Sequence, residues 1–72
     1  MKIEKKIAET FCELAKGLSL AVISQATGLH MSHISCVRHG LRGVSIDNLK
    51  SLADFLGKEV VIRLKEGDIK IN

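Results

Sequence analysis

Apolar residues recur every three or four positions along most of residues 3–57, and this spacing predicts helices rather than strands. In residues 3–16 the apolar positions include Ile7, Phe11 and Leu14, and charged side chains mostly fill the positions between them. The same spacing continues through residues 20–27, 31–39 and 46–55. We therefore expect a mainly α domain of four to five helices.

Polar capping residues and glycines mark the expected helix boundaries. Ser19 and Ser45 stand where a side-chain oxygen can accept a hydrogen bond from the first turn of a helix. Gly28 lies between the second and third expected helices, where it supplies the backbone freedom that a sharp turn needs. His30 is a poor capping residue, so we expect Ser32 or water to hold the start of the third helix instead.

After residue 57 the pattern changes from helical spacing to one typical of strands. Residues 59–64 are rich in β-branched side chains, residues 68–71 alternate polar and apolar, and Gly67 between them fits a hairpin turn. A two-stranded ribbon alone is unstable in water and needs a partner. Two arrangements are open: the ribbon pairs with its equivalent in a second subunit, or it packs on its own helices. In the first case the dimer contacts would come from Val60, Val61, Ile62 and Leu64.

The chain of 72 residues fits one small domain, near the lower limit for a self-sufficient core. Its only aromatic residues besides histidine are two Phe, so aliphatic side chains must form the core. A core of this kind gains stability from burial against a second subunit. We expect residues 1–57 to form the helical part, and residues 58–72 a ribbon of the same domain that contributes to dimer formation.

The charges are unevenly distributed along the chain. The net charge of +3 says little alone, but no carboxylate occurs between Glu13 and Asp47. Lys16, Arg38, Arg42 and all three histidines lie in that span. A carboxylate-free surface avoids repelling a polyanion such as DNA, although chance in a short chain is an alternative explanation.

Two short helices joined by a tight turn are the outline of a helix-turn-helix, a DNA-reading unit. Residues 18–40 resemble the helix-turn-helix of the lambda-repressor/Cro-like (Xre-type) regulators, and the likeness extends over residues 3–57. It rests on Leu18-Ser19, Gly28, Ile34-Ser35, Gly40, Ser45-Ile46-Asp47-Asn48-Leu49 and Leu52-Ala53 with Leu56-Gly57. The residues after 57 resemble, more weakly, the C-terminal strand of some Cro-type proteins and helix-turn-helix antitoxins. The resemblance implies a lambda-repressor-like domain with a short C-terminal β-strand or hairpin.

The resemblance also implies that the N-terminal part of the third helix enters the major groove of DNA. With Ile34 and Val37 turned inward, the side chains expected at base edges are Met31, Ser32, His33, Ser35 and Cys36. Phosphate contacts are expected from Ser19, His30, Arg38, His39, Arg42 and Ser45. None of the base-facing residues is a bidentate Arg or Gln, so we expect modest direct readout and greater reliance on DNA shape.

These features lead us to expect a sequence-specific transcription regulator, most simply a repressor. It would bind a palindromic operator as a homodimer, with recognition helices about 34 Å apart. The alternative is an antitoxin that binds a toxin protein through its ribbon and represses its own operon. The expected partners are therefore double-stranded DNA, a second copy of the chain and, in the alternative, a toxin. No cofactor, small-molecule ligand or membrane association is expected.

His30, His33, Cys36 and His39 recur at every third position, which raises the question of a metal site. Each step of three rotates a helical side chain by about 60°, so four such residues cannot converge on one ion. One adjacent pair with an outside ligand is the alternative, but we expect no metal. We also expect no enzymatic activity, because the sequence has no phosphate-cradling glycine loop and no nucleophile motif. The two cysteines form no CxxC motif, and no apolar run is long enough to span a membrane, which favours a cytoplasmic location.

Overall fold

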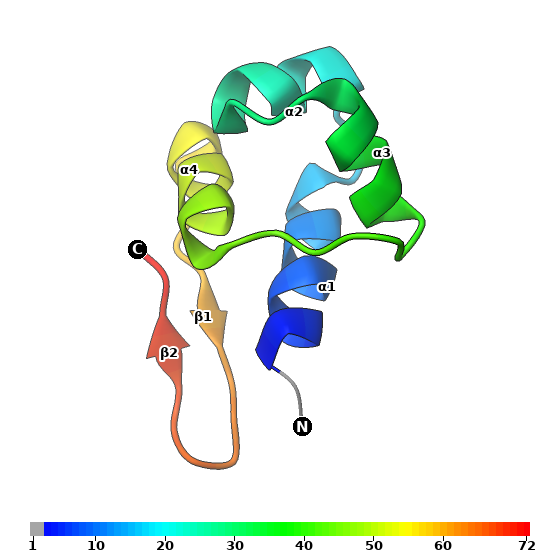
Figure 1. Cartoon of the computed structure of the whole chain (residues 1–72). Helices are drawn as coiled ribbons and strands as arrows, with labels where there is room; N and C mark the ends of the chain where they lie inside the picture. The colour runs from blue at the N-terminus through cyan, green and yellow to red at the C-terminus, as the bar shows by residue number, and fades with distance from the viewer. Residues whose placement is uncertain (1–2) are drawn as a thin grey trace.

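The computed structural model describes residues 3–72, which form four helices followed by a two-stranded hairpin (Figure 1). The helices are α1 (Ile3–Ala15), α2 (Leu20–Thr27), α3 (Met31–Arg38) and α4 (Ile46–Leu56). The strands are β1 (Val61–Ile62) and β2 (Ile69–Lys70). A mainly helical fold with a C-terminal hairpin is therefore confirmed. The first two residues of the predicted helical part lie outside the described residues.

The predicted caps set the boundaries of α2 and α4. The hydroxyl of Ser19 accepts from the backbone N–H of Val22 at 3.2 Å, and that of Ser45 accepts from Asn48 at 3.1 Å. Gly28 ends α2 with a φ of +77°, a conformation that costs other L-residues free energy. A Cβ added there would meet nothing within 4 Å, so the backbone conformation, and not crowding, favours glycine at this turn.

The start of α3 differs from the prediction. Nδ1 of His30 accepts from the backbone N–H of Ser32 at 3.2 Å and lies 2.8 Å from the Ser32 hydroxyl oxygen. His30 itself is therefore the N-cap: its ring nitrogen accepts the backbone hydrogen bond that a Ser or Asp oxygen usually accepts. The expectation that His30 would be replaced in this role by Ser32 or water was wrong, because the His30 ring is turned so that Nδ1 reaches the backbone N–H of Ser32.

All four helices contribute to one aliphatic core. The most deeply buried large side chains, each less than 2% exposed, are Phe11, Ile23, Ile34, Leu49 and Leu52. Helix α4 packs against α1 and α2, and α2 packs against α3. Because each helix supplies at least one of these side chains, removing any helix would expose the core.

The hairpin packs on the helices of its own chain. Its strands are antiparallel, with Ile62 opposite Ile69, and β1 contacts α1. Val60, Ile62 and Ile71 are only 7%, 3% and 6% exposed and belong to the same core. The ladder is shorter than the expected strands, because residues 63 and 65–68 are exposed and no packing holds them flat.

The side chain of Asn72 joins the end of the hairpin to the end of α4. Its Oδ1 accepts from the backbone N–H of Val60 at 2.9 Å. Its Nδ2 donates to the carbonyl oxygen of Lys58 at 2.6 Å and to a carboxylate oxygen of Asp54 at 3.0 Å. These bonds fix the direction in which the chain leaves α4 and enters β1.

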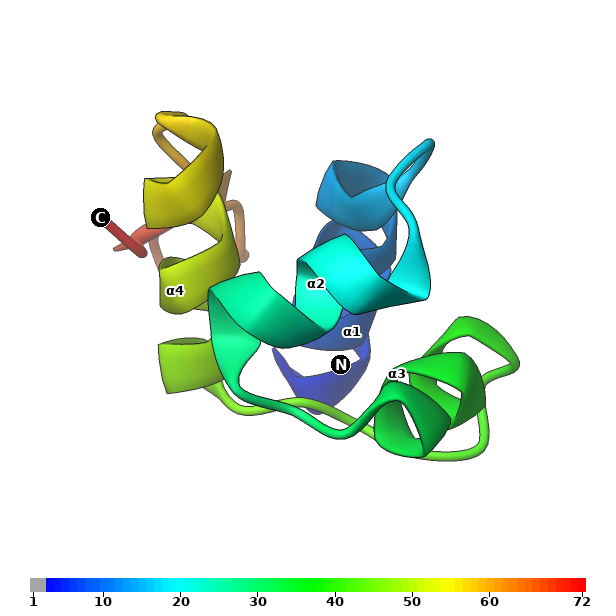
Figure 2. The ribbon, with the colours of Figure 1, turned by 90° about the horizontal axis from the view of Figure 1, so that it is seen from above.

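Helix α3 and the hairpin lie on opposite sides of the molecule. Figure 1 shows α3 beside the loop that leads to α4, far from the hairpin, and Figure 2 shows the same separation from above. The surface around α3 and the surface around the hairpin are therefore separate, and one can be covered while the other stays open.

Candidate nucleic-acid interface

Helix α3 has one buried side and one accessible side. Ile34 and Val37 are 0% and 3% exposed, and they anchor the helix to the core. Met31 is 46% exposed and Ser32 is also exposed. The other predicted base-contacting residues, His33, Ser35 and Cys36, are half-buried. The accessible side is therefore most open over the first turn of α3.

His33 is tied to the loop that follows α3. Its Nε2 lies 3.1 Å from the carbonyl oxygen of Gly43. A carbonyl oxygen can only accept, so Nε2 carries the hydrogen and donates it within the chain. Because it donates within the chain, this nitrogen is not available to donate to a base. Helical spacing did not indicate this partner, because the bond joins a helix to a loop ten positions away.

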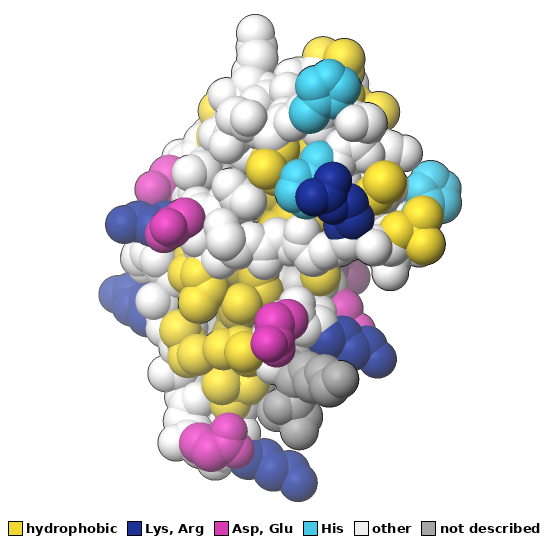
Figure 3. Space-filling view, in the orientation of Figure 1, with side chains coloured by type: hydrophobic (Ala, Val, Ile, Leu, Met, Phe, Trp, Pro, Cys, Tyr) yellow, Lys and Arg dark blue, Asp and Glu magenta, His cyan; other side chains and the backbone are white. Residues whose placement is uncertain are grey.

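His39 ends α3 and is exposed. Its Nδ1 lies 2.8 Å from the carbonyl oxygen of Ser35, one turn back along the helix. Figure 3 shows the three histidines of the chain on a single face, with no acidic side chain between them. The carboxylate-free span of the sequence thus becomes a carboxylate-free part of the surface.

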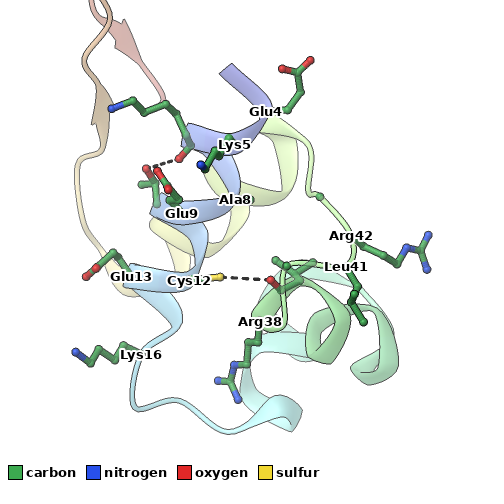
Figure 4. A pocket seen from close by; sticks show the side chains of 15 residues that line it. Glu4, Lys5, Ala8, Glu9, Cys12, Glu13, Lys16, Arg38, Leu41 and Arg42 are labelled. Carbon is green, nitrogen blue, oxygen red and sulfur yellow. Dashed lines mark hydrogen bonds between the residues drawn. The ribbon is translucent and has the colours of Figure 1, made fainter. Parts of the chain in front are cut away.

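Arg38 has a structural role that was not predicted from the sequence. Its Nη2 donates to the carbonyl oxygen of Leu18 at 2.8 Å and lies 3.4 Å from that of Ala15. The guanidinium therefore holds the end of α3 against the turn between α1 and α2. Figure 4 shows the Arg38 and Arg42 side chains pointing in different directions, so the two do not form a joint phosphate site. Arg38 is thus a structural tie through Nη2, and the phosphate contact expected of this exposed side chain stays a prediction.

A groove runs between α1 and residues 37–43, and the sequence did not predict it (Figure 4). Its charged lining is mixed, with lysines and glutamates of α1 on one side and arginines on the other. Leu41 is 75% exposed and Arg42 is exposed, both directly after the end of α3. The hydrophobic pattern of the sequence did not identify this open apolar residue.

Ser19 and Ser45 are exposed, and both act as helix caps. Each hydroxyl oxygen accepts from a backbone N–H, so its own hydrogen is left to donate. A phosphate oxygen is an acceptor and favours the positive end of a helix. Both serines are thus chemically suited to the phosphate contacts expected of them.

The predicted dimer residues divide into two groups. Val60 and Ile62 are buried in the core of their own chain, and Leu64 is half-buried. Val61 alone is open, at 46% exposed. Val60 and Ile62 are therefore withdrawn as dimer contacts, because their side chains are already covered. Phe55 on α4 is 55% exposed and was not identified from the sequence, which placed it only in a helix.

Both cysteines are free thiols. Burial raises the pKa of the Cys12 thiol; the positive charge of Arg38 lowers it and the negative charge of Glu13 raises it further. The thiol lies 3.8 Å from the carbonyl oxygen of Val37, to which it donates weakly (Figure 4). Within residues 3–72, no group of three or more His, Cys, Asp or Glu side chains is placed to hold a metal ion. No helix in the same part of the chain is both long and apolar enough to cross a membrane.

A scan against protein-family models, a search of curated proteins and a search of solved structures each found no match to this chain.

Proposed function

We propose that this chain is a sequence-specific DNA-binding transcription regulator, most simply a repressor, of the lambda-repressor/Cro-like type. The observation that carries the proposal is the surface of α3: an exposed first turn and three histidines, with no carboxylate among them, on a helix anchored to the core. Such a helix fits the major groove, and a carboxylate-free surface suits a polyanion.

A rigid mount for α3 supports this function. Ile34 and Val37 hold the helix to the core, Arg38 ties its end to the α1–α2 turn, and His33 ties its middle to Gly43. Reading a base sequence requires side chains held in fixed positions, because a loose helix loses the geometry of its hydrogen bonds.

The proposed DNA contacts are assigned by the exposure of each side chain and by the hydrogen bonds that it already makes within the chain. Met31 and Ser32, on the open first turn, face the base edges, with Ser35 and Cys36 at the margin. A thioether suits a thymine methyl group, and the Ser32 hydroxyl, whose hydrogen points to Nδ1 of His30, is left to accept from a base. Arg42, His39, Ser19 and Ser45 supply the phosphate contacts, and the Nε2–H of His30 adds another donor.

Two copies would bind a palindromic operator, with their α3 helices about 34 Å apart. Each chain has one α3 helix, so one copy reads one half-site and a second copy is needed for the other. The exposed Phe55 and Val61 lie on elements away from α3 and are the apolar side chains offered to that second copy. A regulator of this kind acts in the cytoplasm, where it meets the chromosome.

A second candidate function is that of an antitoxin. Phe55 and Val61 would in that case contact a toxin protein, which leaves α3 free to bind the operon's own promoter. Purified chain mixed with the product of an adjacent gene would then form a stable complex that Val61→Lys abolishes. A chain that forms only homodimers under these conditions supports the first function.

Selection of bound duplexes from a randomised pool tests the main proposal. We expect enrichment of a palindrome with half-sites one helical turn apart. Ser32→Ala should change the enriched bases. Arg42→Ala should instead weaken binding to all sequences and lower, by about one, the slope of log affinity against log salt concentration. A pool that stays random after repeated selection would show that the proposed function is wrong.

A further inference from the structure

The hydrogen bonds of the three histidines fix where the single proton of each neutral ring lies. His39 uses Nδ1 toward the carbonyl oxygen of Ser35, so that nitrogen must carry the hydrogen. His33 uses Nε2 toward Gly43, so its hydrogen is on Nε2. His30 uses Nδ1 as an acceptor from the backbone of Ser32, so its hydrogen is also on Nε2.

The three neutral rings therefore offer different groups to a ligand. His30 offers an N–H at Nε2, which can donate to a phosphate oxygen. His39 offers only a lone pair at Nε2, which cannot bond a phosphate oxygen, because both atoms are acceptors. His39 can donate to phosphate from Nε2 only after it takes up a second proton, and its bond to Ser35 survives this change because Nδ1 keeps its hydrogen.

The charges around His39 leave a protonated ring without an anionic partner on its own face. Helix α2, which packs on α3, has no titratable side chain; α3 contributes His33, Cys36 and Arg38, and its N-cap is His30. The following loop adds Arg42, and Asp47 lies beyond it in the first turn of α4. Helix α1, across the groove, carries lysines and glutamates together, and His39 does not line that groove. The charged groups of α1 are Glu4, Lys5, Lys6, Glu9 and Glu13, with Lys16 just after it.

We infer that His39 takes up one proton from solvent when the chain binds DNA, and that the new Nε2–H donates to a backbone phosphate. Imidazole is the side chain that changes charge most readily between about pH 5 and pH 8. A nearby phosphate stabilises the charged ring, so binding and protonation favour each other. This inference rests on the proposed function, and its consequence is that affinity for DNA rises as the pH falls.

The first test uses the free protein and needs no DNA. Long-range proton–nitrogen NMR spectra at neutral pH distinguish the two neutral ring forms of each histidine. We expect the hydrogen of His39 on Nδ1 and the hydrogens of His30 and His33 on Nε2. A neutral His39 with its hydrogen on Nε2 would overturn the inference, because that ring could donate to phosphate without a second proton.

The second test measures binding of the duplex enriched from the randomised pool, of about 20 base pairs, at constant salt between about pH 5 and pH 8. We expect the Kd to fall by up to about tenfold for each unit of decreasing pH where His39 is neutral in the free chain. Calorimetry in buffers of different ionisation enthalpy should report the uptake of about one proton for each chain bound.

Two substitutions at one position isolate the nitrogen involved. The amide of His39→Gln places a permanent N–H donor near the position of Nε2, so this variant should bind without proton uptake and with little dependence on pH. His39→Asn keeps only a donor near Nδ1, so it should lose both the pH dependence and the affinity gained at low pH. His33→Gln, which keeps a donor toward Gly43, is the matched control and should retain the pH dependence.

The outcomes separate the inference from the proposed function. Binding with no proton uptake, or a His39→Gln variant with the pH dependence of the natural chain, would overturn the role of His39 and leave DNA binding intact. If the chain binds no duplex at any pH, the proposed function is wrong and the inference falls with it.

Discussion

The guanidinium of Arg38 donates to the carbonyl oxygen of Leu18 in the turn after α1, and lies 3.4 Å from that of Ala15 at the negative end of the α1 dipole. Its partners lie 20 and 23 positions earlier in the chain. A single side chain thus sets how the third helix approaches the first. Arg42, four residues further on, is exposed and free to meet an external anion.

Arg38→Met should lower the free energy of unfolding by about 1 kcal/mol, because it removes a charged hydrogen bond at a partly exposed site. Arg42→Met, the matched control, should change this free energy by less than about 0.5 kcal/mol. Urea denaturation measures both. If Arg42→Met costs as much as Arg38→Met, the tie assigned to Arg38 is wrong.

The thiol of Cys12 makes stability depend on pH in the alkaline range. Burial raises its pKa in the folded state, so the protonated thiol is favoured by folding. The resulting stabilisation is complete below the pKa of the unfolded chain and is lost as the pH rises toward the folded value. The free energy of unfolding should therefore decline at alkaline pH, and less steeply in Cys12→Ala. Equal slopes for the two proteins in urea denaturation across this range would contradict the assignment.

At the scale of elements, the start of α3 depends on an unusual cap. His30→Ala should lower the free energy of unfolding by about 1 kcal/mol, whereas His30→Asn should largely preserve it, because an amide oxygen can accept the same N–H. Thermal unfolding followed by circular dichroism compares the two. Equal losses for both variants would show that the ring stabilises α3 by some means other than capping.

The helix boundaries could be predicted from the sequence because their causes are local. Ser19, Gly28, Ser45 and Gly57 act on residues within one turn, and the structure has them as caps. The ties that mount α3 could not be predicted in this way. His33 to Gly43 and Arg38 to Leu18 join different elements, so they exist only once the elements have packed.

The candidate interface was predictable in composition and less so in geometry. Helical spacing correctly predicted that Ile34 and Val37 are buried and that Met31 and Ser32 are exposed. It could not show which nitrogen of a histidine is engaged, because that depends on ring orientation. It also left the position of the hairpin undecided, since the same apolar side chains could cover a second subunit or their own helices.

At the scale of the whole molecule, the hairpin and the helices form one cooperative unit. Ile62→Ala should destabilise the chain by about 2 to 5 kcal/mol, because it leaves a cavity in the core. Val61→Ala, on the neighbouring exposed position, should cost less than about 0.5 kcal/mol in the monomer. Denaturation at low protein concentration measures both. Similar small losses for the two variants would mean that the hairpin contributes little to the stability of the core.

The sharing of one core by α1 and β1 has a consequence for folding kinetics. Most of the chain separates these two elements, so their contact closes a long loop, and such contacts form late. Ile62→Val should therefore accelerate unfolding and leave the refolding rate nearly unchanged, which stopped-flow measurements in urea resolve. The helices then govern how quickly the native state is reached, and the hairpin governs how long it lasts.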